Sequence, residues 1–479
     1  MTPLTCLLIG DEALLTGCGD ALTGRGHAVV GVVSGSATVQ GWARGAGHAV
    51  VTRAEDLDPD IAFDWLVTVA PTETLPEALR TRARKGAIGF GDGQGGPARA
   101  LLAGAAAHAV TWHLIEAAGQ AGDILVEKPV AIAATDTAAT LTAKCAAAGR
   151  EGFDTLMDQL ETGKFARRPQ DRTDRRTAPV PGLDMAGRLD FTQSAAQIAR
   201  LVRALDFGAG WNPLTTPKIK AGGRLLSVAR ARPVETLATA EPGTVLSVSP
   251  EAMTVATGDG ALRLSGFSDL SGRPVTLYTQ ALEDAVLASP DPAEAEALRS
   301  MLDALAPVEA HWRTRLACFR PARLALAAPP SGRASWDHRR FDAPAGLDDD
   351  TVLAALAAWG LRNTGDWGAG LAYAGAGITA AARAHPGYVS PWVPLGLGLE
   401  DPAAQPVAAL ARALAPDLAA ARTGGFAADL VARDPDLAAV ETPALGLSRH
   451  DPVEGTALTL ALDAGRVTLW RDARMIDDA

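Results

Sequence analysis

Short apolar segments alternate with helix-compatible segments in the first part of the chain, and this alternation most constrains its fold. Cys6–Gly10 is an apolar run that ends in glycine, His27–Val33 is a second and Trp65–Ala70 is a third. Runs of this length are typical of parallel strands that are buried on both faces. Leu14–Arg25, between the first two, has the composition of a helix and is followed by glycine. The pattern predicts an α/β domain with a Rossmann-like open sheet over residues 1–165.

The second half of this domain combines a glycine-rich turn with a predicted antiparallel strand pair. Gly91–Gly96 satisfies the GxGxxG pattern between a predicted strand and a predicted helix at Ala100–Ala107. Such a turn can hold a nucleotide phosphate, but in dinucleotide-binding folds it follows the first strand, and a shortened loop explains the glycines equally well. Val110–Leu114 and Asp123–Val126 are predicted to pair, and Thr137–Thr162 is predicted to form a long helix.

Length, charge and cysteine usage exclude several classes of protein. The chain has 479 residues, 48% of them hydrophobic, which predicts about three domains with ample cores. A net charge of −11 argues against a nucleic-acid partner. No apolar run reaches the roughly 18 residues of a membrane span, so no membrane contact is expected. The four cysteines lack metal-ligand spacing, and we expect a reduced, cytoplasmic protein without a metal site.

Two further segments complete the first 280 residues. Residues 166–187 are charged and contain proline, which predicts an exposed linker, although their basic run could also bind an anion. Residues 188–280 begin with a helix whose start carries a capping box formed by Ser194 and Gln197. Short strands separated by small turns then predict a small antiparallel β-barrel: Arg224–Ala229, Gly243–Val248, Met253–Ala256 and Ala261–Gly266.

Residues 295–479 differ in composition and are predicted to form a third, mixed α/β lobe. Alanine-rich helical patterns cover Thr351–Leu361 and Val407–Ala415. Leu458–Trp470 has the pattern of a hairpin that turns at Asp463–Gly465.

Several motifs in residues 1–275 carry a family resemblance. They are Thr111-Trp-His113 and Gly122-Asp-Ile-Leu125 in the first domain, and Arg188-Leu-Asp-Phe191, Asn212-Pro-Leu214 and Pro242-Gly-Thr-Val245 in the second. With the order of elements, they resemble the 10-formyltetrahydrofolate-dependent formyltransferase family, which includes methionyl-tRNA formyltransferase. The likeness is closest to the subtype at the N-terminus of nonribosomal peptide synthetases. It implies a formyltransferase domain followed by that family's C-terminal barrel.

The resemblance also locates the family's catalytic positions. Active members carry Asn-x-His and Asp-x-Gly-Asp, because formyl transfer to an amine needs donors for the developing oxyanion and a base for the amine proton. In this chain Gly89 occupies the position of the family's Asn, Gly91 the position of its His, and Gln120 the position of its Asp. Glycine has no side chain, and glutamine does not take up a proton near neutral pH. We therefore expect no catalytic residue at these vestigial positions and no formyl transfer.

His113 and Asp123 are the possible remnants of the site. The resemblance places both in framework strands, so we predict a hydrogen-bonded framework histidine and an aspartate that stabilises the turn. The alternative is that one of them acts as a new base in a rearranged site. The protein would then still formylate an amine in secondary-metabolite biosynthesis, with 10-formyltetrahydrofolate as its co-substrate.

The third lobe resembles part of a condensation domain from peptide synthetases. Pro307–Arg313 and Phe426–Arg433 carry this likeness. Active condensation domains use His-His-x-x-x-Asp-Gly, but this sequence contains no His-His pair. About 185 residues provide roughly half of a full condensation domain, so the likeness implies a shortened, one-lobed version.

Together these features predict a catalytically degenerate formyltransferase-like and condensation-like region. It would act as a structural or docking part of a nonribosomal peptide synthetase system, with adenylation and carrier modules, fused or adjacent, as its partners. No cofactor is expected under this interpretation. The apparent strand close to Ala479 would suit a segment of a longer synthetase.

Overall fold

The computed structural model divides the chain into two compact units. Unit 1 comprises Met1–Val180 and Arg203–Gly208, and unit 2 comprises Pro181–Val202 and Ala209–Ala479. Three sheets with accompanying helices confirm the predicted mixed α/β class. The structure describes residues 3–69, 75–92, 96–116, 121–170, 183, 185–235, 240–277, 282, 285–329, 332, 334–398, 404–437 and 440–476.

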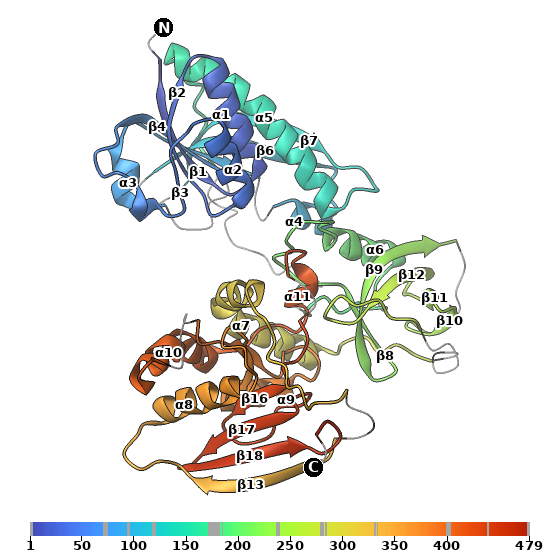
Figure 1. Ribbon diagram of the computed structural model, residues 1–479. Helices are drawn as coiled ribbons and strands as arrows, with labels where there is room; N and C mark the ends of the chain where they lie inside the picture. The colour runs from blue at the N-terminus through green and yellow to red at the C-terminus, as the bar shows by residue number, and fades with distance from the viewer. Residues whose placement is uncertain are drawn as a thin grey trace. The chain divides into compact units, whose positions relative to one another are not determined.

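Unit 1 is built on an open sheet with helices packed beside it (Figure 1). Its seven strands lie in the order β3-β2-β1-β4-β5-β6-β7. The strands from β1 to β5 are parallel, and β6 and β7 are antiparallel. The order of the first five is that of doubly wound nucleotide-binding folds. The strands are β1 (Thr5–Gly10), β2 (Ala28–Val33), β3 (Val50–Val51), β4 (Phe63–Val69), β5 (Ala83–Gly91), β6 (Ala107–Ile115) and β7 (Ala121–Ala131). The helices are α1 (Ala13–Gly24), α2 (Ala37–Gly45), α3 (Glu77–Arg82), α4 (Gly96–Leu102) and α5 (Ala138–Thr162).

Both faces of this sheet are covered, as the continuous apolar strands predict. Cys6 and Leu8 of β1 belong to the core that includes α1, α2 and α5. Leu7 and Ile9 belong to the opposite core, which includes Leu79 of α3. The predicted strands and the long helix are present. The prediction of a helix over Ala100–Ala107 is wrong at its C-terminal end, since α4 ends at Leu102. Gly104 takes a positive φ of 66° that ends the helix, and Ala107 already begins β6.

Trp112 fixes the orientation of β6 against α5. Its side chain is 1% exposed, and its Nε1 donates to the Gly149 carbonyl at 2.8 Å. A Cβ at Gly152 would lie only 3.2 Å from Trp112 Cδ1, so this helix glycine permits the close approach. Since side chains alternate along a strand, Thr111 and His113 point to the other face of β6.

The first part of unit 2 is an antiparallel sheet in the order β10-β11-β12-β9-β8. Its strands are β8 (Lys218–Ala221), β9 (Arg224–Val234), β10 (Val245–Val248), β11 (Ala252–Ala256) and β12 (Ala261–Ser268). The preceding helix, α6 (Ala195–Ala204), begins with the predicted capping box: Gln197 N donates to Ser194 Oγ at 3.2 Å, and Ser194 N donates to Gln197 Oε1 at 3.0 Å. The four predicted strands are confirmed, whereas β8 was not foreseen.

The rest of unit 2 forms a lobe around a six-stranded sheet ordered β13-β18-β17-β16-β14-β15. Its strands are β13 (Trp336–Asp342), β14 (Leu371–Ala374), β15 (Val393–Leu395), β16 (Leu445–Ser448), β17 (Leu458–Asp463) and β18 (Arg466–Asp472). Its helices are α7 (Pro292–Ala317), α8 (Asp349–Arg362), α9 (Ala376–Ala384), α10 (Val407–Thr423) and α11 (Leu430–Arg433). The predicted hairpin is confirmed, with its turn at Ala464 and Gly465.

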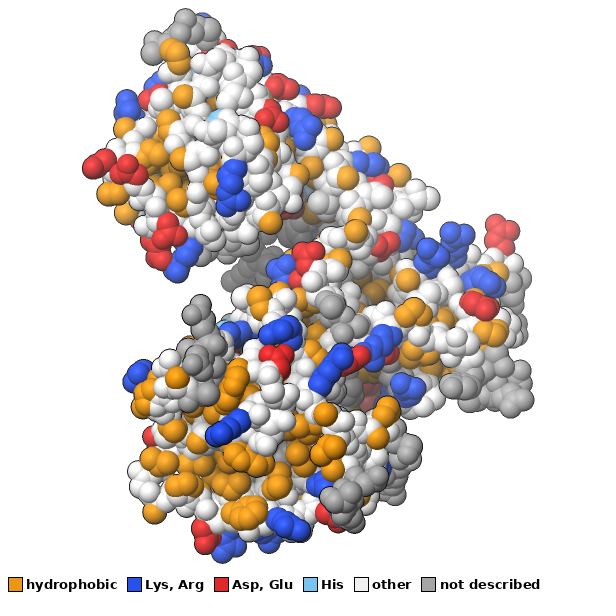
Figure 2. Space-filling model, in the orientation of Figure 1, with side chains coloured by type: hydrophobic (Ala, Val, Ile, Leu, Met, Phe, Trp, Pro, Cys, Tyr) orange, Lys and Arg blue, Asp and Glu red, His pale blue; other side chains and the backbone are white. Residues whose placement is uncertain are grey.

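Hydrophobic side chains gather on the visible face of this lobe (Figure 2). Phe341 of β13 is 54% exposed and Trp359 of α8 is 49% exposed. Large exposed apolar side chains cost solvation free energy, so their concentration in one lobe is a feature that an interaction surface would explain.

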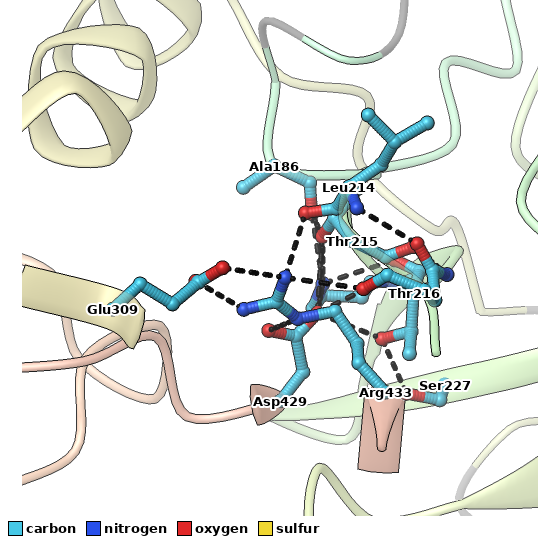
Figure 3. A network of polar contacts seen from close by, with 10 residues as sticks. Ala186, Leu214, Thr215, Thr216, Ser227, Glu309, Asp429 and Arg433 are labelled. Atoms are coloured by element: carbon cyan, nitrogen blue, oxygen red, sulfur yellow. Dashed lines mark hydrogen bonds and ion pairs between the residues drawn. The ribbon is translucent and has the colours of Figure 1, made fainter. Parts of the chain in front are cut away.

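A buried network of charges joins the β8–β9 sheet to the lobe within unit 2 (Figure 3). Lys218 Nζ lies 2.6 Å from Asp429 Oδ2, and the two side chains are 3% and 2% exposed. The same carboxylate accepts hydrogen bonds from the hydroxyl groups of Thr215 and Thr216 at 3.0 and 3.1 Å. Arg433 of α11 pairs with Asp429 and with Glu309 of α7. The two buried cations are thus matched by two carboxylates, as buried charges require.

Candidate functional site

Gly91, one of the vestigial positions, lines a cavity of about 560 Å³ in unit 1. The cavity lies beside the antiparallel part of the sheet, where β5, β6 and β7 adjoin. Thr111 and His113 of β6 line it together with their cross-strand partners on β7, Glu127 and Ile124. Residues 168–170 also line it.

The His113 ring lies over both vestigial glycines. Gly89 pairs with His113 across the β5–β6 ladder, and Gly91 pairs with Thr111. Cross-strand partners share a face of the sheet, so a side chain at either glycine would point to the face that carries His113 and Thr111. A Cβ at Gly89 would lie 3.2 Å from His113 Nε2. A Cβ at Gly91 would lie 3.2 Å from His113 Cε1 and 3.0 Å from Thr111 Oγ1. The histidine that the sequence assigned to the framework is therefore a close neighbour of both positions, and side chains there would require its ring to shift by a few tenths of an ångström.

An ion pair adds polar groups to the same cavity. Glu127 of β7 lies 2.7 Å from Arg168, and both side chains are partly exposed. Arg168 is held there by two backbone hydrogen bonds with Ile124, of 2.8 and 2.9 Å, which extend the sheet by one bridge. The cavity thus offers an imidazole, a hydroxyl group, a carboxylate and a guanidinium. These groups can orient a polar ligand, and the imidazole can accept a proton.

The remaining predicted positions do not complete a catalytic set. Asp123 lies on β7 but is not among the described residues that line the cavity. Gln120 lies outside the described residues. Thr111, which was named only as part of a resemblance motif, and Glu127 are polar cavity residues to which the sequence interpretation gave no role. The sequence did contain a signal for Thr111: side chains alternate along a strand, so Thr111 lies on the same face of β6 as His113.

Two other properties of the described chain bear on its chemistry. Within the described ranges, no group of three His, Cys, Asp or Glu side chains could hold a metal ion. None of the helices that could be searched is both long and apolar enough to cross a membrane.

The contacts of His113 predict a coupled effect on stability. Gly89→Asn combined with Gly91→His should lower the free energy of unfolding of unit 1 by about 1–3 kcal/mol, because the added side chains overfill the space under the ring. His113→Ala should relieve much of this loss, since it removes the ring that both new side chains meet. Urea unfolding of the four combinations measures the coupling.

Gly41→Asn is a matched control, because nothing lies within 4 Å of a Cβ at that exposed helix position. It should be nearly neutral. Strict additivity between His113→Ala and the glycine substitutions would show that the ring does not occupy this space.

Comparison with known proteins gives one family match. Residues 184–279 match the model described as formyl transferase, C-terminal domain. Among solved structures, the chain is similar to WlaRD, a sugar 3N-formyltransferase studied with dTDP and 5-N-formyl-THF, at 12% identity, over 55% of this chain and 97% of that one, with a TM-score of 0.42. It is similar to an N-formyltransferase from Helicobacter canadensis in complex with folinic acid and dTDP-3-aminofucose, at 13% identity, over 56% and 100% of the two chains, with a TM-score of 0.42.

A third similar structure is HypX from Aquifex aeolicus in complex with tetrahydrofolic acid, at 20% identity and a TM-score of 0.39. The match covers 56% of this chain but only 44% of HypX. The family match over residues 184–279 supports a relationship of this chain to the formyltransferases.

Proposed function

We propose that this chain is a formyltransferase relative that has lost formyl transfer and serves as a structural or docking part of a nonribosomal peptide synthetase system. The observation that carries the proposed loss of chemistry is the absence of side chains at Gly89 and Gly91. The two positions that the family resemblance assigns to the reacting groups therefore offer neither the Asn donor nor the His base.

The energetic consequence follows from what formyl transfer requires. The tetrahedral intermediate develops negative charge that a positioned donor must stabilise, and loss of one such donor costs roughly 3 kcal/mol. The residues present at the vestigial positions supply neither this donor nor a base for formyl transfer from a folate. We derive no catalytic step through it.

A docking role accounts for what has been retained. The five-stranded antiparallel sheet and the C-terminal lobe form one unit, joined by the buried charges of Lys218, Asp429 and Arg433. The lobe exposes Phe341 and Trp359 although its sequence lacks the paired histidines of active condensation domains. We propose an adenylation and carrier module as the partner that covers these side chains.

Binding to such a module tests the docking role. The purified chain is mixed with the adenylation and carrier protein encoded with it, and the association is measured by analytical ultracentrifugation. Phe341→Asp with Trp359→Asp should weaken the complex by about tenfold or more, because large aromatic side chains dominate interface energetics. Leu246→Asp, at a 40% exposed position of β10, is the control that should leave binding intact. Equal binding by both variants, or none by the parent chain, would contradict the proposal.

The second candidate function is a formyltransferase with a rearranged site. The cavity of about 560 Å³ that is lined by His113, Glu127 and Arg168 favours it. Calorimetry with 5-formyltetrahydrofolate separates the two functions. Tight binding that Glu127→Gln or Arg168→Gln weakens would favour the rearranged enzyme, and absence of heat would favour the docking role.

A further inference from the structure

A second cavity, of about 580 Å³, lies within unit 2 between the β8–β9 hairpin and the C-terminal lobe. Leu225 of β9, Leu298 of α7 and Tyr388 line it and belong to one hydrophobic cluster. The cavity therefore has an apolar floor and a volume in the range of small-molecule sites.

The hairpin directs a lysine toward this floor. Gly222 and Gly223 have φ values of 55° and 75°, which is the backbone of the tight two-residue turn that pairs Lys220 with Leu225. Cross-strand partners share a face, so Lys220 lies on the side of Leu225. That side faces the lobe, because a Cβ at Gly387 would lie 3.2 Å from Leu225 Cδ1.

Two cationic side chains, Lys220 and Arg224, line the cavity. Arg224 pairs with Ala221, so its side chain starts from the other face of the hairpin and reaches the cavity at the turn. Within the described part of the chain, neither Lys220 nor Arg224 forms a salt bridge. The one acidic lining residue among those described, Glu294, already pairs with buried Arg188 at 3.2 Å.

Tyr388 adds a hydrogen-bond donor at the base. Arg188 Nη1 donates to the Tyr388 hydroxyl oxygen at 2.7 Å. A guanidinium can only donate, so the Tyr388 hydrogen points to another acceptor. Burial raises the pKa of Tyr388, and the hydroxyl group therefore keeps its proton at neutral pH.

From this arrangement we propose that the cavity binds a small amphipathic anion, with its carboxylate or phosphate held by Lys220 and Arg224 and its apolar chain against Leu225 and Leu298. Charge-assisted hydrogen bonds would supply the specificity for the head group, and burial of the apolar chain would supply affinity. This site is independent of the cavity in unit 1 and of the proposed docking role.

Calorimetry with four probes identifies the required chemistry. Octanoate and octyl phosphate test the two head groups on the same chain, inorganic phosphate tests the head group alone, and octyl glucoside tests an uncharged amphiphile. We expect one or both octyl anions to bind at least about tenfold more tightly than inorganic phosphate or octyl glucoside, since only they use both parts of the cavity. Equal binding of phosphate alone, or equal binding of octyl glucoside, would overturn the proposal.

Variants then locate the binding. Lys220→Gln with Arg224→Gln should weaken binding of the octyl anion by about tenfold or more, as expected when two charged contacts are lost. Arg230→Gln with Arg232→Gln removes the same charge from exposed positions of the same strand and should have little effect. Ala297→Phe fills the cavity from an exposed position of α7 and should abolish binding. Equal effects of the two double variants, or full binding by Ala297→Phe, would contradict this site.

Discussion

Asp429→Ala is expected to lower the free energy of unfolding of unit 2 by about 3–5 kcal/mol, because it leaves buried positive charge without its partner. Lys218 and Arg433 are 3% and 1% exposed and cannot recover water without opening the structure. The substitution also removes the acceptor for Thr215 and Thr216. Urea unfolding monitored by circular dichroism measures the loss.

Two controls separate burial from charge in this prediction. Asp451→Ala breaks a pair with Arg383 whose members are 43% and 70% exposed, so it should cost less than about 1 kcal/mol. Lys218→Met with Asp429→Leu replaces the buried pair by apolar side chains and should recover much of the lost stability. If Asp429→Ala costs no more than Asp451→Ala, the network does not hold the five-stranded antiparallel sheet to the lobe.

The pH dependence of the same network has a defined sign. Burial by itself raises the pKa of Asp429, but the charges of Lys218 and Arg433 outweigh it and hold the pKa well below its usual range. The stabilisation by Asp429 is therefore fully present above the unfolded-state pKa of about 3.9 and is lost as the pH falls through the lower folded-state pKa. The deficit of Asp429→Ala should be constant between about pH 5 and pH 8 and should shrink in stronger acid.

The second large effect concerns catalysis. We expect formyl transfer from 10-formyltetrahydrofolate to an aminoacyl acceptor to be at least about 10²-fold slower than in a formyltransferase that retains Asn-x-His, since loss of a single oxyanion donor has that effect. Gly89 and Gly91 lack both the donor and the base. Such an enzyme, assayed beside this chain with the same acceptor, is the positive control.

The sequence predicted the local elements of this fold better than its long-range contacts. Apolar runs and glycines gave the strands of unit 1, and the capping box of Ser194 and Gln197 located the start of α6. β8 was missed because its four residues alternate two lysines with apolar side chains, a pattern too short to distinguish from a loop. One of those lysines, Lys218, is buried by Asp429, which lies 211 residues away in the sequence. No local pattern can predict such a pair.

In the candidate site, too, the sequence indicated individual positions but not the contacts between them. The family resemblance identified Gly89, Gly91 and His113 as its positions, but it placed His113 in the framework. Only the β5–β6 register shows that the ring covers the two glycines. The ion pair of Glu127 and Arg168 depends on a bridge between β7 and the segment after α5, which sequence spacing alone does not reveal.

Mass spectrometry of the acceptor after a single turnover tests the loss of formyl transfer most directly. The chain, in excess over an aminoacyl carrier and supplied with 10-formyltetrahydrofolate, is compared with its His113→Ala variant and with a reaction that contains no protein. The account predicts the same background formylation in all three reactions. Formylation well above background by the parent chain, abolished by His113→Ala, would contradict it and would establish His113 as the base of a working site.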